Sequence, residues 1–338
     1  MLWMSEGDTD YMALNRLARA LLGAMLVSAA LPCDAIAAWP ERSITLVHGF
    51  GAGGNADVTA RIIAEPLGAR LGQALVVEPK PGAGGRLSAT HTAKAVPDGY
   101  TLGILPGGHA IAAALYDNLP YDTVNDFTFI TMLTDFPFIL ATYPDHPVKT
   151  VADLIAAAKA PGAKPMIYGS AGNGTGQHLS GALFTSMAGI DFQHLPTRGG
   201  SNAATQVIGK HIDFLFDTPT LLLEQIRGGQ LRAVATTGKE RFFALPDVPT
   251  IGETVPGYET SSWLGLAAPL HLPAEIVERL RKETTAVLAE PTVAERLRVL
   301  GNIPSPTTPA GFKERVAADV AKWTKVAAGA GLKRTEVK

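Results

Sequence analysis

Apolar runs that pass through glycine-rich loops into helical patterns recur along the chain. The first is Ile44 to Val47, a β-branched run typical of a strand buried on both faces. It leads through the glycines of 49–54 into a helical pattern over 60–71. The same order follows with a strand at 73–78, a glycine turn at 81–87, a helix at 88–95 and a strand at 101–105. This alternation predicts parallel strands with helical crossovers, whose ligands lie at the carboxyl ends of the strands.

The pattern starts again after a polar turn at 120–127. The second set of elements comprises an apolar strand at 138–142, a helix at 151–159, a strand at 165–168, a glycine turn at 169–176, a helix at 177–188, a turn at 194–200, a helix at 203–209 and a strand at 212–216. A strand-like segment at 262–268 and helices over 274–288 and 311–326 close the chain. We expect two α/β lobes, 38–137 with 262–338 and 138–261, joined by crossing strands near 138–142 and 263–267 that act as a hinge.

Composition excludes two classes of protein. The chain has 338 residues, of which 46% are hydrophobic and 18% charged, so it can bury two cores and is not of the disordered class. Its formal net charge is −2, and no block of Lys and Arg occurs, which argues against a nucleic-acid partner.

The first 37 residues are typical of a secretory signal peptide. Arg16 and Arg19 precede an apolar run over 20–31, and Ala35 and Ala37 give the small-residue pattern of a cleavage site after Ala37. We therefore expect a periplasmic protein, and Met12 makes a better start than the acidic segment from Met1. The cysteine, Cys33, lies in this segment, and its alternative use as a lipid anchor is disfavoured because Pro32 precedes it.

The loop at 49–54 predicts an anion site. Glycines allow the backbone to approach a ligand, and the unpaired N–H groups of the helix that follows favour carboxylate, phosphate or pyrophosphate. The residues also satisfy G-x-G-x-x-G, with Glu78 about twenty residues further on, so a dinucleotide-binding enzyme is an alternative. Export disfavours it, as does Asp57, whose charge in the first helical turn would oppose a pyrophosphate.

Other catalytic motifs are lacking. The segment from Tyr168 to Gly172 has tyrosine where a hydrolase elbow has its first glycine, and no Walker loop occurs. The eight histidines have no metal-ligand spacing. We expect no enzyme activity, no catalytic residues, no metal and no cofactor. Asp57, His178 and Asp217 also have purely structural interpretations, as a helix-dipole partner, a core histidine and a strand-end residue.

A set of ordered motifs identifies a family. They are Phe50 to Asp57, Leu71 to Gln73, Pro81 to Gly85, Pro97 to Leu102, Leu119 to Asp122, Gly174 to Thr175 with His178, Arg232 to Ala235, Pro246 to Thr250 and Trp263 to Leu266. In these the chain resembles the Bug family, the extracytoplasmic solute receptors of tripartite tricarboxylate transporters. The resemblance implies a monomeric two-lobe periplasmic-binding-protein fold of type II. Each lobe is expected to be a mostly parallel sheet flanked by helices.

The resemblance also implies a function. Two lobes would capture a small carboxylate-bearing organic acid and deliver it to the membrane subunits of the transporter, or alternatively report it to a sensor kinase. The ligand-binding candidates are Phe50, Gly51, Ala52, Gly53, Gly54, Asp57, Gly84, Arg86, Ser170, Gly172, Asn173, Gly174, Thr175, His178, Thr197, Arg198 and Asp217. The family usually has proline at 49, asparagine at 86 and Tyr-Lys at 197–198, where this chain has glycine, arginine and Thr-Arg. These departures leave the ligand's identity open.

Overall fold

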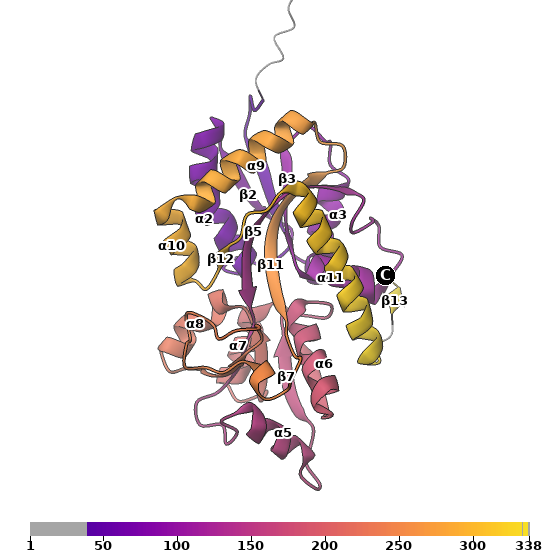
Figure 1. Cartoon of the computed structure of the whole chain (residues 1–338), viewed down its shortest axis with the longest axis vertical. Coiled ribbons are helices and arrows are strands. Elements are labelled where there is room, and N and C mark those ends of the chain that lie inside the picture. Colours follow the sequence, from indigo (N-terminus) through magenta and orange to yellow (C-terminus); the bar gives the residue numbers. More distant parts are fainter. Residues whose placement is uncertain (1–38, 333, 337–338) are drawn as a thin grey trace, which may run out of the picture. The chain divides into compact units, whose positions relative to one another are not determined.

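The computed structural model describes residues 39–332 and 334–336 (Figure 1). The predicted signal peptide, with Met12 and Cys33, lies outside these residues. From Arg42 onward the chain forms one compact unit, to which all the elements below belong. In the part of the chain that is described, no helix combines the length and the apolar character that crossing a membrane requires.

The first sheet has six strands in the order β12-β5-β11-β3-β1-β2. They are β12 (Ile303–Pro304), β5 (Phe127–Pro137), β11 (Ser261–Pro269), β3 (Thr101–Pro106), β1 (Ile44–His48) and β2 (Leu75–Pro79). Strand β1 pairs in parallel with β2 and β3, whereas β11 runs antiparallel to both β3 and β5. The three strands predicted for the first lobe therefore lie at one end of this sheet.

The second sheet has five strands in the order β10-β6-β9-β7-β8. They are β10 (Arg232–Thr236), β6 (Ile139–Thr142), β9 (Phe214–Asp217), β7 (Met166–Ser170) and β8 (Phe192–Pro196). Strand β7 is parallel to β8 and β9, and β6 is antiparallel to β9 and β10. The short strands β4 (Tyr116–Asp117) and β13 (Thr335–Glu336) pair in parallel apart from both sheets.

Both sheets are mixed, so the expectation of mostly parallel sheets needs correction. The strands that precede glycine loops are parallel because helical crossovers connect them, as the sequence pattern predicted. Strands β5, β6 and β11 carry the chain from one sheet to the other without such a crossover. Their pairs with neighbouring strands are antiparallel.

Helices cover both sheets. In Figure 1, α9, α10 and α11 lie with the first sheet, and α5 to α8 surround the second. The bounds are α2 (Asn55–Leu71), α3 (Arg86–Ala93), α4 (Gly108–Leu115), α5 (Val151–Lys159), α6 (Gly176–Ala188), α7 (Gly200–Ile208), α8 (Pro219–Arg227), α9 (Ala274–Ala289), α10 (Pro291–Val299) and α11 (Pro309–Gly329), with 3-10 turns at Ala83–Gly85 and Ile251–Glu253. Helix α5 has the predicted bounds. The sequence pattern did not predict α4, α8 and α10, and α2 begins five residues earlier than expected.

Alternation along the strands builds the core of the second lobe. Leu140, Phe214 and Phe216 point into one apolar cluster beneath the sheet, whereas Ile139 and Leu215 belong to the cluster on its other face. All five side chains are buried completely. Burial on both faces is what a β-branched or aromatic run without polar alternation predicts, and it fixes the strand ends that carry the loops of the site.

Over residues 39–332 the chain passes between the two sheets twice, at Pro137–Phe138 and in the segment that ends at Thr260–Ser261. The buried side chain of Thr237 lies between them. Its Oγ1 accepts a hydrogen bond from the Phe138 amide over 2.8 Å and donates to the Thr260 carbonyl over 2.8 Å. The Thr237 backbone also donates to Phe138 and accepts from Thr260. One residue therefore ties the two crossings together, at the point where the chain leaves β5 and at the point where it enters β11.

Candidate functional site

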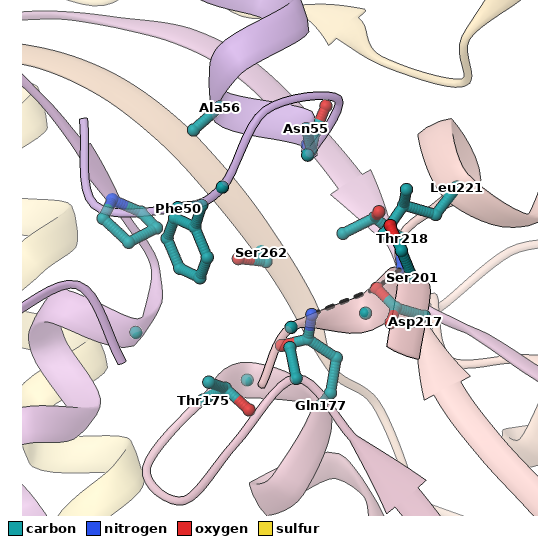
Figure 2. Close-up of a pocket in the computed structure, with 18 of the residues that line it drawn as sticks. Phe50, Asn55, Ala56, Thr175, Gln177, Ser201, Asp217, Thr218, Leu221 and Ser262 are labelled. Atoms are coloured by element: carbon teal, nitrogen blue, oxygen red, sulfur yellow. Dashed lines mark hydrogen bonds between the residues drawn. The ribbon is translucent and has the colours of Figure 1, made fainter. Parts of the chain in front are cut away.

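A cavity of about 230 Å³ lies between the loops of the two sheets (Figure 2). Its lining comes from both lobes: Phe50, Gly51, Ala52, Gly54, Asn55, Ala56, Gly84, Pro106, Gly108, Phe136, Phe138, Ala171, Thr175, Gly176, Gln177, Arg198, Gly199, Gly200, Ser201, Asp217, Thr218, Leu221, Ser262 and Leu264. Eight of these were predicted from the sequence, namely Phe50, Gly51, Ala52, Gly54, Gly84, Thr175, Arg198 and Asp217. The cavity lies at the carboxyl ends of the parallel strands, where the fold class places ligands.

Five helices begin at this cavity. The first residues of α2, α4, α6 and α7 line it, and so does Thr218, the residue that precedes α8; these residues are Asn55, Gly108, Gly176, Gly200 and Thr218. The first N–H groups of a helix have no partner within that helix, and its dipole places positive charge there. Five such ends around one cavity create a field that favours a negatively charged ligand.

Asp57 holds the first glycine loop from behind. Its carboxylate accepts hydrogen bonds from the Gly53 amide over 3.0 Å and from Arg61 Nε over 3.1 Å, and it lies 3.2 Å from His48 Nε2. Burial alone would raise the pKa of Asp57, but the hydrogen bonds from Arg61 and Gly53 together with the charge of Arg61 lower it below its ordinary value. Burial lowers the pKa of His48. The pair is therefore a charged carboxylate beside a neutral imidazole at neutral pH.

Gly49 is required for a close approach between two loops. A Cβ at this position would lie 2.5 Å from the Cα of Gly85 and 2.6 Å from the Oγ of Ser88, closer than packing allows. The loop after β1 and the loop after β2 therefore touch backbone to backbone. This contact explains glycine at a position where its conformational freedom is not used, since the φ of Gly49 is not positive.

A buried polar cluster connects the lobes beside the cavity. Thr220 of α8 donates from Oγ1 to Asn55 Oδ1 over 2.7 Å, and Asn302 donates from Nδ2 to the same oxygen over 2.8 Å. Asn302 Nδ2 also lies 3.0 Å from Thr220 Oγ1. Because Asn55 opens α2 of the first lobe, this cluster, called here the Asn55 latch, holds the two lobes together.

Asp217 is the acidic residue among those lining the cavity, and it is fully buried. Its Oδ1 accepts from the Thr218 amide over 2.7 Å and from Gln177 Nε2 over 3.2 Å, the contact drawn in Figure 2. Burial raises the pKa of Asp217 to about 6, and the two donors oppose that rise. Among the described residues, none donates a hydrogen bond to its Oδ2.

A second, outer cavity of about 520 Å³ shares part of this lining. It contains the predicted residues Arg86, Gly172, Asn173 and Thr197, and it shares Arg198 with the first cavity. The Arg86 guanidinium lies over the ring of Tyr116, 3.6 Å from its centroid. The two arginines give the outer cavity a positive lining.

Five predicted candidates lie outside both linings: Gly53, Asp57, Ser170, Gly174 and His178. Ser170 Oγ contacts His194 Nε2 over 2.7 Å, and His194 stacks on His178 with 4.0 Å between ring centroids. Burial lowers the pKa of His178 to about 4 and that of His194 to about 3. These side chains are neutral and lie behind the loop at 172–176. Gly174 donates to His178 Nδ1, so the group supports that loop from behind.

Sequence reasoning missed most of the polar lining. Asn55, Gln177, Ser201, Thr218 and Ser262 all line the cavity. The first four lie at or beside helix starts, a signal that could have identified them. However, α2, α6 and α7 were expected to begin one to five residues later, and α8 was not predicted. The alternative of a dinucleotide-binding enzyme requires Glu78 as the acidic residue that contacts the ligand. Glu78 instead pairs with Lys80 and lines neither cavity, which disfavours that alternative.

Comparison with known proteins decides the family. The family model described as "Tripartite tricarboxylate transporter family receptor" matches residues 59–332. The chain belongs to this family. A UPF0065 protein of Agrobacterium vitis, from the TAR-I ttuE-ttuC' intergenic region, is 36% identical over 316 residues, covering 92% of this chain and 91% of the relative. The resemblance to the Bug receptors of these transporters is thus confirmed, and the chain is a solute-binding receptor.

Solved structures agree with this assignment. The structure of Rpa4515 of R. palustris with adipate has a TM-score of 0.84 and 34% identity, covering 88% of this receptor and all of that chain. The structure of the periplasmic binding protein BugD has a TM-score of 0.82 and 32% identity, with coverage of 88% and 100%. The two-lobe fold is therefore that of the receptor's family.

Proposed function

We propose that this receptor binds a small carboxylate-bearing organic acid in the cavity between its lobes and delivers it to the membrane subunits of a tripartite tricarboxylate transporter. The observation that carries the proposal is the convergence of five helix starts on one cavity of about 230 Å³. That field suits an anion. The adipate in the related Rpa4515 structure is a carboxylate of this class.

The proposal includes further features of the receptor. It acts as a monomer in the periplasm after cleavage behind Ala37, and it performs no chemistry on its ligand. Residues 38–137 with 262–338 form one lobe and 138–261 the other. Loop residues of both lobes donate backbone N–H groups to the carboxylate, so the ligand stabilises the closed arrangement because only that arrangement brings both sets of donors to it.

A thermal-shift and calorimetry panel tests the proposal. Aliphatic mono-, di- and tricarboxylates, amino acids and aromatic acids are each compared with the uncharged amide of the same skeleton. We expect at least one acid to raise the melting temperature while its amide does not, because the helix starts recognise the negative charge. If no acid binds, or if amides bind as well as acids, the proposal is wrong.

The delivery step needs its own measurement. Purification of the tagged receptor from membranes of its host, with ligand present, is expected to retain transporter subunits. Recovery of a sensor kinase without transporter subunits would contradict delivery and assign the receptor to signalling.

A further inference from the structure

One carboxylate oxygen of Asp217, Oδ2, accepts no hydrogen bond from the described residues. The side chain is fully buried, Oδ1 has two donors, and Oδ2 has none among the described residues. Position 200 leaves space beside this oxygen only as glycine, since a Cβ there would lie 2.1 Å from Oδ2. A buried carboxylate oxygen without a donor costs free energy comparable to a lost charged hydrogen bond. The site is therefore incomplete without a donor.

Within the part of the chain that the structure describes, two further polar atoms of the cavity lining have no hydrogen-bond partner. They are Asn55 Nδ2 and Thr218 Oγ1. In the structure Asn55 Oδ1 accepts from Thr220 and Asn302, which leaves Nδ2 as the donor of this amide toward the cavity side. Figure 2 shows Asn55, Thr218 and Asp217 on one side of the cavity, across from Phe50. That side offers an acceptor, a donor and a hydroxyl.

The chemistry of this polar side restricts the ligand. A ligand carboxylate without a nearby donor would repel the Asp217 carboxylate, because the two negative charges would share one small cavity. A hydroxyl or ammonium group on the ligand would donate to Oδ2. This hydrogen bond would pair the buried oxygen and offset the repulsion between the two carboxylates. A site built around a buried acceptor discriminates strongly against an analogue that lacks the donor, since the acceptor is then left unpaired.

Resting on the proposed function, we propose that the cavity selects a carboxylate that also carries a hydroxyl or ammonium donor, and that Asp217 is the residue responsible for this selection. The carboxylate of the ligand lies toward the helix starts, and its donor faces Asp217. Burial places the pKa of Asp217 near 6, so it is an ionised acceptor at neutral pH.

Calorimetry on matched acids tests the selection in the wild-type receptor. Three series differ only in the substituent: succinate, malate and aspartate; glutarate, 2-hydroxyglutarate and glutamate; phenylacetate, mandelate and phenylglycine. In the series that binds, we expect the hydroxy or amino member to bind at least about tenfold more tightly than the unsubstituted acid. Comparison of the hydroxy with the amino member then distinguishes the two donors.

Asp217→Asn tests the residue. The amide keeps an oxygen for Thr218 and Gln177 but presents an NH₂ group where Oδ2 was, so the preference is expected to fall below about threefold or to reverse. Asp145→Asn, the same change at an exposed carboxylate that pairs with Lys210, is the control and should keep the wild-type preference. Circular dichroism confirms folding, and the wild-type series is decisive if the variant does not fold.

The outcomes separate the two proposals. If unsubstituted acids bind as tightly as their hydroxy and amino counterparts, or if Asp217→Asn keeps the full preference, the inference about Asp217 is overturned while the carboxylate receptor stands. If no acid in these series or in the wider panel binds, the proposed function fails and this inference fails with it.

Discussion

Thr220 Oγ1 donates a 2.7 Å hydrogen bond to Asn55 Oδ1, and these two atoms belong to different lobes. Asn302 contacts both of them. Since Asn55 also lines the cavity, the contact joins the two lobes at a residue of the site itself.

Replacement of Thr220 by valine removes this hydroxyl at nearly constant volume. We expect ligand affinity to fall about 5- to 30-fold, equivalent to ~1–2 kcal/mol, because the contact between the lobes loses a partly buried hydrogen bond. Isothermal titration calorimetry measures the change. Thr324→Val, on the exposed face of α11, removes a hydroxyl that bonds within its own helix and should leave affinity unchanged. Equal losses in both variants would contradict the role of the latch.

A second prediction concerns Thr237 at the crossings. Thr237→Val leaves the Phe138 amide and the Thr260 carbonyl without their side-chain partner in a fully buried place. The free energy of unfolding should fall by about 2–4 kcal/mol, because each buried group left unpaired costs ~1–3 kcal/mol. Urea denaturation measures it. Thr237→Ser keeps the hydroxyl and should retain most of the stability; a loss as large as that of valine would show that the methyl packing matters instead.

Asp57 is expected to act on affinity through the loop that it holds. In Asp57→Ala the Gly53 amide loses its acceptor, so amide hydrogen exchange over 51–55 should accelerate and affinity should fall about 3- to 10-fold. The comparison variant is Asp153→Ala, which removes the capping box of α5, away from both cavities. It should cost stability without changing affinity. Unchanged hydrogen exchange and affinity in Asp57→Ala would show that Asp57 only interacts with the dipole of α2 and does not support the site.

The raised pKa of Asp217 predicts a pH dependence of stability. Between about pH 4 and 6 the folded receptor binds a proton at Asp217 that the unfolded chain releases, so this residue makes stability fall as pH rises through that window. Asp217→Asn removes the effect. Without ligand, its stability relative to wild type should therefore be greater at pH 7.5 than at pH 4.5, by about 2 kcal/mol.

Urea denaturation of both proteins at the two pH values tests this. Asp135, whose pKa burial also raises to about 6, contributes with the same sign in both proteins and cancels. The other lining side chain that carries charge is Arg198, which is exposed. A difference that does not depend on pH would mean that Asp217 titrates alike in the folded and unfolded states.

The sequence predicted the parts of the structure that local pattern controls. The strand at 44–47, the helix at 151–159 and the lining residues Phe50 and Gly51 follow from an apolar run, an amphipathic helical pattern and a glycine-rich loop. What it missed depends on packing between distant segments. Gln177 and Thr218 lie in one site only because α6 and α8 follow strands β7 and β9, which are neighbours in the sheet. Ser170 and His178 do not line the cavity, because the Ser170 hydroxyl and the His178 ring both pack against His194.

The contact between Gly49 and Gly85 has a consequence for how related receptors diverge. Two ligand-facing loops that touch through bare backbone can accept no new side chain at that contact without moving apart. A relative with a side chain at position 49, such as proline, must therefore hold these two loops further apart than this receptor does. The first-lobe side of its cavity then has a different shape, so its ligand preference should differ from that of this receptor even where the residues at 198, 201, 217 and 218 are the same.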